Sequence, residues 1–308
     1  MNKVMIIAGK EFTTAFKDKV LLIMAVLLLV MSIVSVYVGS ATKNAELRVY
    51  EEIVIEANAK GDQPPEAPVS YPLTILHNMI EYIVMNGAVL AIFLGFDAFS
   101  SERDGGTLRV ILARPITRAK FIAGKVLGAG LMIGALLLAA FIFNVILYAV
   151  FTGLFPNGNE ILRLMLFIIT AFVYMMGFYL FSLLISVHSH DRTFSFLIMM
   201  TVWICISFVI PELADTQRNH AWAVSNTAGT IAQIPSDTAI STFIDWFSPA
   251  VQFKHIGNEL LQMNSESATM GVGAVFLGQI ARFLYIVILS FIPFQLSVKA
   301  AKKEGVLC

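Results

Sequence analysis

Residues 126–151 read VLGAGLMIGALLLAAFIFNVILYAVF, and no charged residue occurs between Lys125 and Glu160. A run of about 20 apolar residues can cross the hydrocarbon core of a bilayer as a helix. Over the whole chain of 308 residues, 57% are apolar and 14% are charged. This composition excludes a disordered chain, which needs low hydrophobicity and high charge. It also argues against a soluble enzyme, because so much apolar surface could not be covered. We therefore expect a polytopic membrane protein.

Five further stretches have the same apolar character, which gives six predicted spans at residues 20–38, 73–99, 126–151, 165–187, 194–210 and 272–296. Each must be a helix, because an open strand would leave backbone groups unpaired in lipid. The fold class that we predict is an all-α polytopic membrane protein, with residues 1–308 forming a single transmembrane domain. The first span is too long for the apolar part of a signal peptide, so we interpret it as a retained anchor.

The charges between the spans predict the orientation. The N-terminus, residues 99–125, residues 188–192 and the C-terminus carry 14 cations and, with Asp97, 7 acids. The opposite segments, 39–72, 152–164 and 211–271, carry 6 cations and 13 acids. Because cytoplasmic loops are enriched in Lys and Arg, the first set is expected in the cytoplasm. The overall net charge of zero is then a cancellation of two opposite faces, and it also argues against a nucleic-acid partner, which a basic excess would favour.

The outer segments 39–72 and 211–271 are long. In the second, an apolar cluster at residues 243–247 precedes Ser248-Pro249, a pair typical of a helix start. We expect short helices at the outer membrane surface there.

Residues 3–18 form an amphipathic pattern when they are wound as a helix. Six apolar residues fall within an arc of roughly 120°: Val4, Met5, Ala8, Phe12, Ala15 and Phe16. Lys3, Lys10 and Lys17 recur every seven residues on the other side. The pattern is typical of a helix in the headgroup region. It is also compatible with a plain basic flank, or with a helix that contacts a cytoplasmic partner as well.

The segment between spans two and three reads SSERDGGTLRVILARPITRAKFIAGK over residues 100–125. The Gly105-Gly106 pair should end the preceding helix. Thr107 can cap a new short helix, which Pro115 ends, and Leu108, Ile111 and Leu112 share one face of it. Such a helix could dock in a groove of another protein. A basic loop that only satisfies the charge rule is the alternative.

This segment resembles the signature of type-2 ABC transporter permeases: an acidic pair, Gly-Thr-Leu, a later Pro, an Arg and then Gly-Lys. The matching positions are Glu102, Asp104, Gly106, Thr107, Leu108, Pro115, Arg118, Gly124 and Lys125. Within that class the doubled glycine and the Gly-Lys pair are most similar to the copper-assembly permease of nitrous oxide reductase.

The resemblance implies how the chain would work. The segment after Gly106 would be the coupling helix, with Glu102, Asp104, Gly106, Thr107, Leu108, Ile111, Pro115 and Arg118 as ATPase-coupling residues. Residues 3–18 would be the connecting helix, with Lys3, Lys10, Phe12, Phe16 and Lys17 as its marked residues. Two permeases, this chain and a second copy or a related chain, would pair above two ATPase subunits.

The chain itself lacks a nucleotide site. A P-loop needs G-x-x-x-x-G-K-[ST], whereas Ala119 and Val126 occupy the first and last positions around Gly124-Lys125. We therefore predict a non-catalytic subunit without a bound cofactor, whose partner ATPase holds ATP and magnesium.

Span two contains polar residues, His77, Glu81 and Asn86 among them, which we consider a candidate translocation path. His77 and Glu81 are four residues apart and so share a helical face. Alternatively, span two starts later and Glu81 reaches the outer headgroups. Arg282 in span six could pair with Glu81 or extend outward.

The other candidate ligands favour ordinary roles. His188 and His190 could bind copper or zinc, but without a nearby Cys a solvated turn is the better interpretation, so no metal site is predicted. The methionine pairs at 175–176 and 199–200 are interpreted as packing, and Cys205 and Cys308 as reduced thiols.

The sequence thus predicts the permease subunit of an ATP-driven exporter in a bacterial or archaeal plasma membrane, multi-pass, in contact with lipid, and with both termini cytoplasmic. One alternative is an ABC complex that transmits force or assembles an extracytoplasmic machine, docking an extracytoplasmic partner protein through the outer segments. The other is a stand-alone channel or secondary carrier.

Overall fold

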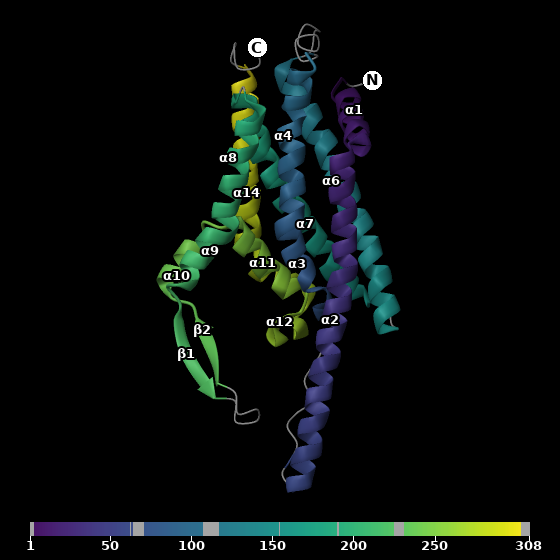
Figure 1. Cartoon of the computed structure of the whole chain (residues 1–308), viewed down its shortest axis with the longest axis vertical. Coiled ribbons are helices and arrows are strands. Elements are labelled where there is room, and N and C mark those ends of the chain that lie inside the picture. Colours follow the sequence, from purple (N-terminus) through teal and green to yellow (C-terminus); the bar gives the residue numbers. More distant parts are fainter. Residues whose placement is uncertain are drawn as a thin grey trace.

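The computed structural model describes residues 3–61, 63, 71–106, 117–153, 155–189, 191–224 and 231–302. Within them, six helices are long and apolar enough to cross a membrane, and they run side by side (Figure 1). This confirms the predicted all-α architecture with six spans.

The chain begins with α1 (Lys3–Lys17) and the first span, α2 (Lys19–Lys60). The second span is composite and consists of η1 (Pro72–Leu76), α3 (Asn78–Tyr82), η2 (Ile83–Gly87) and α4 (Ala88–Asp104). The third and fourth spans are α6 (Arg118–Thr152) and α7 (Gly158–His188). The fifth consists of α8 (Arg192–Ile204), η3 (Cys205–Val209) and α9 (Ile210–Asp215). An outer region then follows, with β1 (Asn219–Val224), β2 (Ile231–Ser236), α10 (Ala239–Asp245), α11 (Pro249–Leu260), α12 (Ser265–Thr269) and α13 (Val272–Gly278), before the last span, α14 (Ile280–Lys302).

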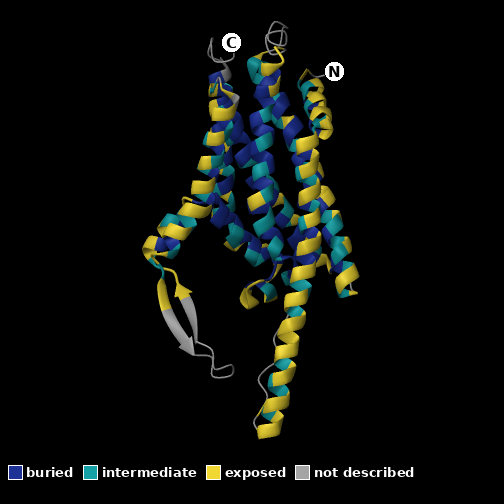
Figure 2. Cartoon of the chain, viewed as in Figure 1, coloured by how far each residue is buried: buried dark blue, intermediate teal, exposed yellow. Residues whose placement is uncertain are grey.

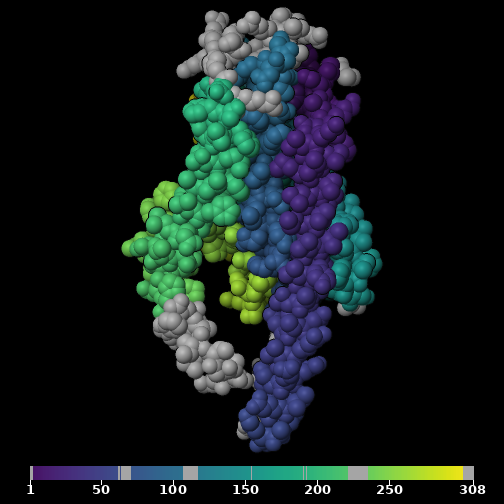
Figure 3. Space-filling model, viewed as in Figure 1, coloured from purple at the N-terminus to yellow at the C-terminus, as the bar shows by residue number. Residues whose placement is uncertain are grey.

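Helix α2 is much longer than a membrane requires. Its 42 residues correspond to about 63 Å, whereas the hydrocarbon core is about 30 Å thick. The helix therefore continues through the predicted outer segment as an extension that projects below the bundle (Figures 1 and 3). It ends at Gly61, whose left-handed backbone (φ 76°) donates its N–H to the carbonyls of Ala57 and Asn58.

The sixth span differs from its predicted bounds of 272–296. The helix is interrupted at Gln279, between α13 and α14, and the segment that is long enough to span runs over Ile280–Ala300. Within α13, Gly273 and Gly278 lack the side chains that favour a helix. Spans two and five each contain one π-helical turn, η2 and η3, which no pattern in the sequence predicted.

The outer region holds the predicted short helices and, in addition, an antiparallel hairpin of β1 and β2 that was not predicted. The predicted helix start at Ser248-Pro249 is confirmed, since the Ser248 side chain accepts a hydrogen bond from the Val251 N–H at 3.3 Å. Arg218, just before β1, donates to Asp215, Asp237 and Asp245 at 2.8–3.0 Å. Burial raises the pKa of the Asp245 carboxyl above its ordinary value, and the Arg218 guanidinium opposes this rise.

Helix α7 lies at the centre of the bundle and packs against α4, α6, α8, α11 and α14. Buried residues gather along α4 and α7, while the α2 extension is mostly exposed (Figure 2). Gly95 of α4 touches the α7 backbone, and the Ser182 hydroxyl of α7 donates to the Ile92 carbonyl at 2.7 Å. Such small residues and hydroxyl bonds are the usual means of helix association in lipid.

Both termini lie at one end of the bundle, together with the end of α4 and the start of α6 (Figure 1). An even number of spans places them there, and the following section concerns this end.

The close α4–α7 contact yields a test. A Cβ at Gly95 would lie 2.4 Å from the Tyr179 carbonyl oxygen, whereas a Cβ at Gly130 of α6 meets nothing nearer than 3.8 Å. Gly95→Ala should lower the free energy of unfolding in detergent by about 2 kcal/mol, because backbone must shift. Gly130→Ala should leave it unchanged or raise it by up to about 1 kcal/mol through helix propensity. Equal effects of the two variants would contradict this packing.

Candidate functional site

A group of charges with a buried centre joins α1, α4 and α6 at the end of the bundle that carries the termini. We call it the ion-pair junction, and it consists of Lys10, Glu11, Glu102 and Lys125. The Lys125 ammonium lies 3.0 Å from the Glu11 carboxylate and 3.1 Å from that of Glu102. The Lys10 ammonium lies 2.6 Å from the second oxygen of Glu102. Three helices are therefore linked by alternating charges.

Lys125 is the centre of the junction, because its side chain is only 1% exposed. Its ammonium also lies 5.4 Å from the ring centroid of Phe99 and 5.1 Å from that of Phe121. A buried ammonium is costly unless it is paired, and removal of one partner of such a pair typically costs 3–5 kcal/mol. The Lys10–Glu102 pair is half exposed on the lysine side and contributes less.

Two glycines of α6 let α1 approach closely enough to reach Lys125. A Cβ at Gly124 would lie 2.7 Å from the Cβ of Ile7, and one at Gly128 would lie 2.5 Å from the Cβ of Glu11. No larger residue fits at either position without moving α1. The two glycines are four residues apart and so share a helix face, on which α1 lies.

The junction lies at the two helix ends that flank the predicted coupling segment, the end of α4 and the start of α6. Glu102 is on the last turn of α4, before Gly105-Gly106, and Gly106 has a left-handed φ of 67°. Lys125 is about two turns into α6, which begins at Arg118. Thr107, Leu108, Ile111 and Pro115 lie outside the described residues, so their predicted helix remains a prediction.

The predicted coupling residues thus separate into two kinds. Glu102 faces inward and is buried, whereas Asp104 is exposed. Arg103 holds the same end of α4 to α7 through the carbonyls of Ser186 and Ser189. Glu11 was not singled out from the sequence; its only signal was an acid beside Lys10 in an otherwise basic helix.

The predicted connecting helix exists as α1, and its apolar face is divided. Ala8 and Ala15 are buried, and Phe12 packs partly against the core. Met5 and Phe16 are each 59% exposed. The exposed part of this face is available to headgroups or to a protein, and Lys3 and Lys17 lie exposed beside it.

The polar residues of span two lie toward the opposite end. Glu81 pairs with Lys254 of α11 at 2.8 Å, and both side chains are partly exposed. His77 faces an outer cavity of about 460 Å³ between α2, η1 and α12, and Asn86 lies half-buried in the π-helical turn. The pairing of Glu81 with Arg282 that we considered is wrong, since Arg282 donates to Gln279 instead.

The outer helices are held by a second buried cation. Arg163 of α7 is 2% exposed and donates to the carbonyls of Glu259, Ser267 and Met270 at 2.7–3.2 Å. It thereby holds the end of α11 and the segment around α12 against α7.

Possible metal ligands were also located. The His188 ring lies at the end of α7, with its Nδ1 2.9 Å from the Leu184 carbonyl oxygen. In the described part of the chain, no three His, Cys, Asp or Glu residues gather as a metal site would require.

The structure combines six spans, an amphipathic helix before the first span, and the ion-pair junction at the Glu-x-x-Gly-Gly segment. The family model of the ABC-2 family transporter proteins matches residues 5–305. The chain belongs to the ABC-2 transporter family. It is accordingly a transmembrane permease of an ABC transporter, and the type-2 resemblance is confirmed.

One curated relative supports the same assignment. Over 143 residues the chain is 27% identical to the probable ABC transporter permease protein NosY of Stutzerimonas stutzeri. The match covers 46% of this chain and 44% of that protein, so less than half of either is aligned.

Glu102→Gln tests the junction, because it removes one of the two carboxylates at Lys125 and keeps the side-chain shape. The free energy of unfolding in detergent should fall by about 3 kcal/mol. Asp104→Asn, an exposed change on the same turn, should shift it by less than about 0.5 kcal/mol. If Glu102→Gln unfolded like the wild type, as Asp104→Asn is expected to do, the result would contradict a stabilising role of the junction.

Proposed function

We propose that this ABC-2 permease couples ATP hydrolysis in separate ATPase subunits to transmembrane export. The observation that carries the proposal is the ion-pair junction. Because Lys125 binds carboxylates from both α1 and α4, a displacement of residues 107–116 must act on α1, α4 and α6 together. The three helices would move as one unit when the ATPase closes.

The family assignment supports a proposal about the partners. Two ATPase subunits, which would hold ATP and magnesium, would bind at the end that carries the termini. That end would face the cytoplasm, since the adjoining segments hold 14 cations against 7 acids. A second copy of the chain or a related permease would complete the complex in the bacterial or archaeal plasma membrane. The chain itself would hydrolyse nothing, since it lacks a P-loop.

A second candidate function is suggested by the α2 extension. A helix that continues about 20 residues past a membrane-spanning length, with Leu47, Val49 and Ile55 exposed, is suited to hold another protein. The complex would then transmit force to an extracytoplasmic partner without moving a substrate.

Co-purification tests the coupling. The tagged chain, extracted from its native membrane, should retain an ATPase that mass spectrometry identifies. Leu108→Asp or Ile111→Asp should remove that ATPase, because a charge would enter the apolar face of the coupling segment. Glu102→Gln should retain the ATPase but lower ATP turnover in liposomes. Lys60→Gln on the α2 extension is the control for both measurements.

The outcomes separate an ATPase-coupled complex from a stand-alone channel or carrier. A chain that purifies without an ATPase would overturn the proposal and favour a stand-alone channel or carrier. A retained ATPase after both Asp substitutions would place the contact elsewhere on the chain.

The candidate path at His77, Glu81 and Asn86 is tested through the Glu81–Lys254 pair. If the Glu81 carboxylate lines the path, Glu81→Gln should lower ATP turnover of the reconstituted complex severalfold without loss of the ATPase. Lys254→Gln, which breaks the same pair but keeps the carboxylate, should have a smaller effect. Equal loss in both variants would mean that the pair only holds α11 in place.

A further inference from the structure

One face of α7 borders two cavities that lie one after the other along the helix. The cavity nearer the termini has a volume of about 720 Å³, and the deeper one about 200 Å³. The α7 residues that line the deeper cavity and then the larger one are Tyr174, Gly177, Phe178, Phe181, Leu184, Ile185, His188 and Ser189. Among them, Tyr174, Phe178, Phe181, Ile185 and His188 follow one another at intervals of three or four residues, which is the spacing of a single helical face. We call this the α7 seam.

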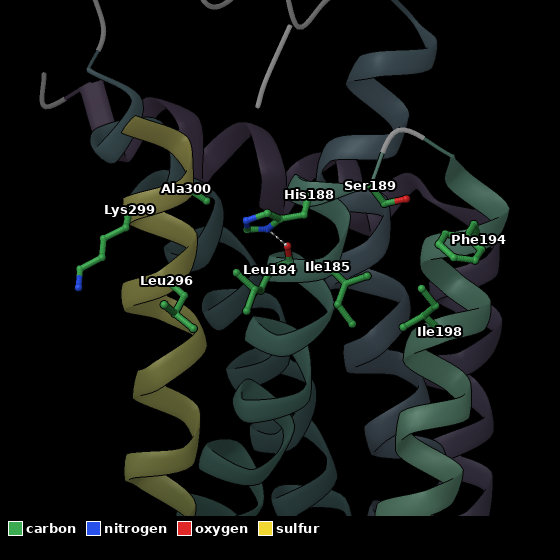
Figure 4. Close-up of a pocket in the computed structure, with 9 residues that line it drawn as sticks. All are labelled: Leu184, Ile185, His188, Ser189, Phe194, Ile198, Leu296, Lys299 and Ala300. Carbon is green, nitrogen blue, oxygen red and sulfur yellow. Dashed lines mark hydrogen bonds between the residues drawn. The ribbon is translucent and has the colours of Figure 1, made fainter. Parts of the chain in front are cut away.

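The same two neighbours wall both cavities. Phe194 and Ile198 of α8 line the larger cavity, and Met199 and Val202 of the same helix line the deeper one. From α14, Leu296 and Ala300 line the larger cavity (Figure 4). Both helices pack against α7, so α8 and α14 flank the α7 seam at both cavities. We call the two cavities, taken together, the groove along the α7 seam.

Polarity is confined to one end of the larger cavity. His188 reaches from α7 toward α14, and Ser189 lies beside it (Figure 4). Lys299 of α14 also lines this cavity, and its side chain points away from His188 in Figure 4. Because its four-carbon stem is flexible, the ammonium can turn toward a headgroup bound at the rim. Below them, the walls are Leu, Ile and Phe side chains. The groove therefore has a polar head at the membrane boundary and an apolar body inside the membrane.

The dimensions suit a single acyl chain. The α7 residues from His188 to Tyr174 span about 21 Å along the helix, and one leaflet of the hydrocarbon core is about 15 Å thick. A chain that enters beside His188 would reach the deeper cavity and the residues around Tyr174. The larger cavity also falls within the 300–1,000 Å³ typical of ligand sites.

We propose that the α7 seam binds one anionic phospholipid, with its headgroup at His188 and Lys299 and an acyl chain along α7. Charge complementarity selects this occupant over a zwitterionic lipid, since a lysine near the boundary attracts anionic headgroups. The site does not depend on the ATPase or on the exported substrate, because every residue of the groove belongs to this chain.

Native mass spectrometry of the full chain tests the proposal, with dioleoyl-phosphatidylglycerol and dioleoyl-phosphatidylcholine titrated separately. The wild type should bind one phosphatidylglycerol about fivefold or more tightly than phosphatidylcholine. The double variant His188→Gln and Lys299→Gln should lose that preference and keep the weaker binding. Lys120→Gln, an exposed lysine on α6 at the same end, is the charge-matched control and should keep it.

The body of the groove is tested by volume. Ile198→Trp would place a bulky ring in the larger cavity, across the path of an acyl chain, and should abolish the tight binding of either lipid, whereas Leu138→Trp on the exposed face of α6 should not. Unfolding curves of both variants establish that they are folded. Equal affinities for the two lipids in the wild type would overturn the proposal. So would unchanged phosphatidylglycerol binding in the double variant or in a folded Ile198→Trp variant.

Discussion

The buried ammonium of Lys125 is the constraint on which the terminal end of this bundle depends. An ammonium that is 1% exposed must keep its carboxylate partners, since they offset the free-energy cost of its desolvation. Its two partners, Glu11 and Glu102, lie 91 residues apart in the chain, and both must approach at once. Gly124 and Gly128 make that approach sterically feasible. The charge therefore fixes where α1 lies and how the end of α4 and the start of α6 sit against each other.

Elsewhere the bundle is held mainly by close contacts, supplemented by charged side chains such as Arg163. Because lipid tails are as apolar as side chains, helices in a membrane associate through packing and hydrogen bonds. The α4–α7 contact at Gly95 and the Ser182 bond are examples. At the outer end, Phe253 of α11 stacks on Tyr174 with ring centroids 4.8 Å apart, and Arg163 secures the same helix. The bundle is thus closed at the end opposite the termini by a helix that is not itself a span.

The candidate site could be predicted only in part. The Glu102 to Lys125 segment stands out because its glycines, threonine and proline form a pattern within 24 residues. The pattern could not indicate that Glu102 turns inward while Asp104 stays exposed, since both acids read alike in the sequence. Glu11 and Lys254 escaped notice because their partners are far away in the chain. Arg282 was matched with Glu81 on charge alone, although a nearer cation from α11 takes that place.

The sequence by itself determined the number of spans, their helical state and the charge asymmetry between the two ends. Apolar length and the need to pair every backbone group in lipid leave no other solution. Only the tertiary structure decided the partners of the buried charges, the π-helical turns, the hairpin, the interruption at Gln279 and the groove along α7. These features depend on which helix faces meet. An apolar stretch of sequence does not indicate its neighbours, because a Leu or Ile side chain is accommodated almost equally well by lipid and by another helix.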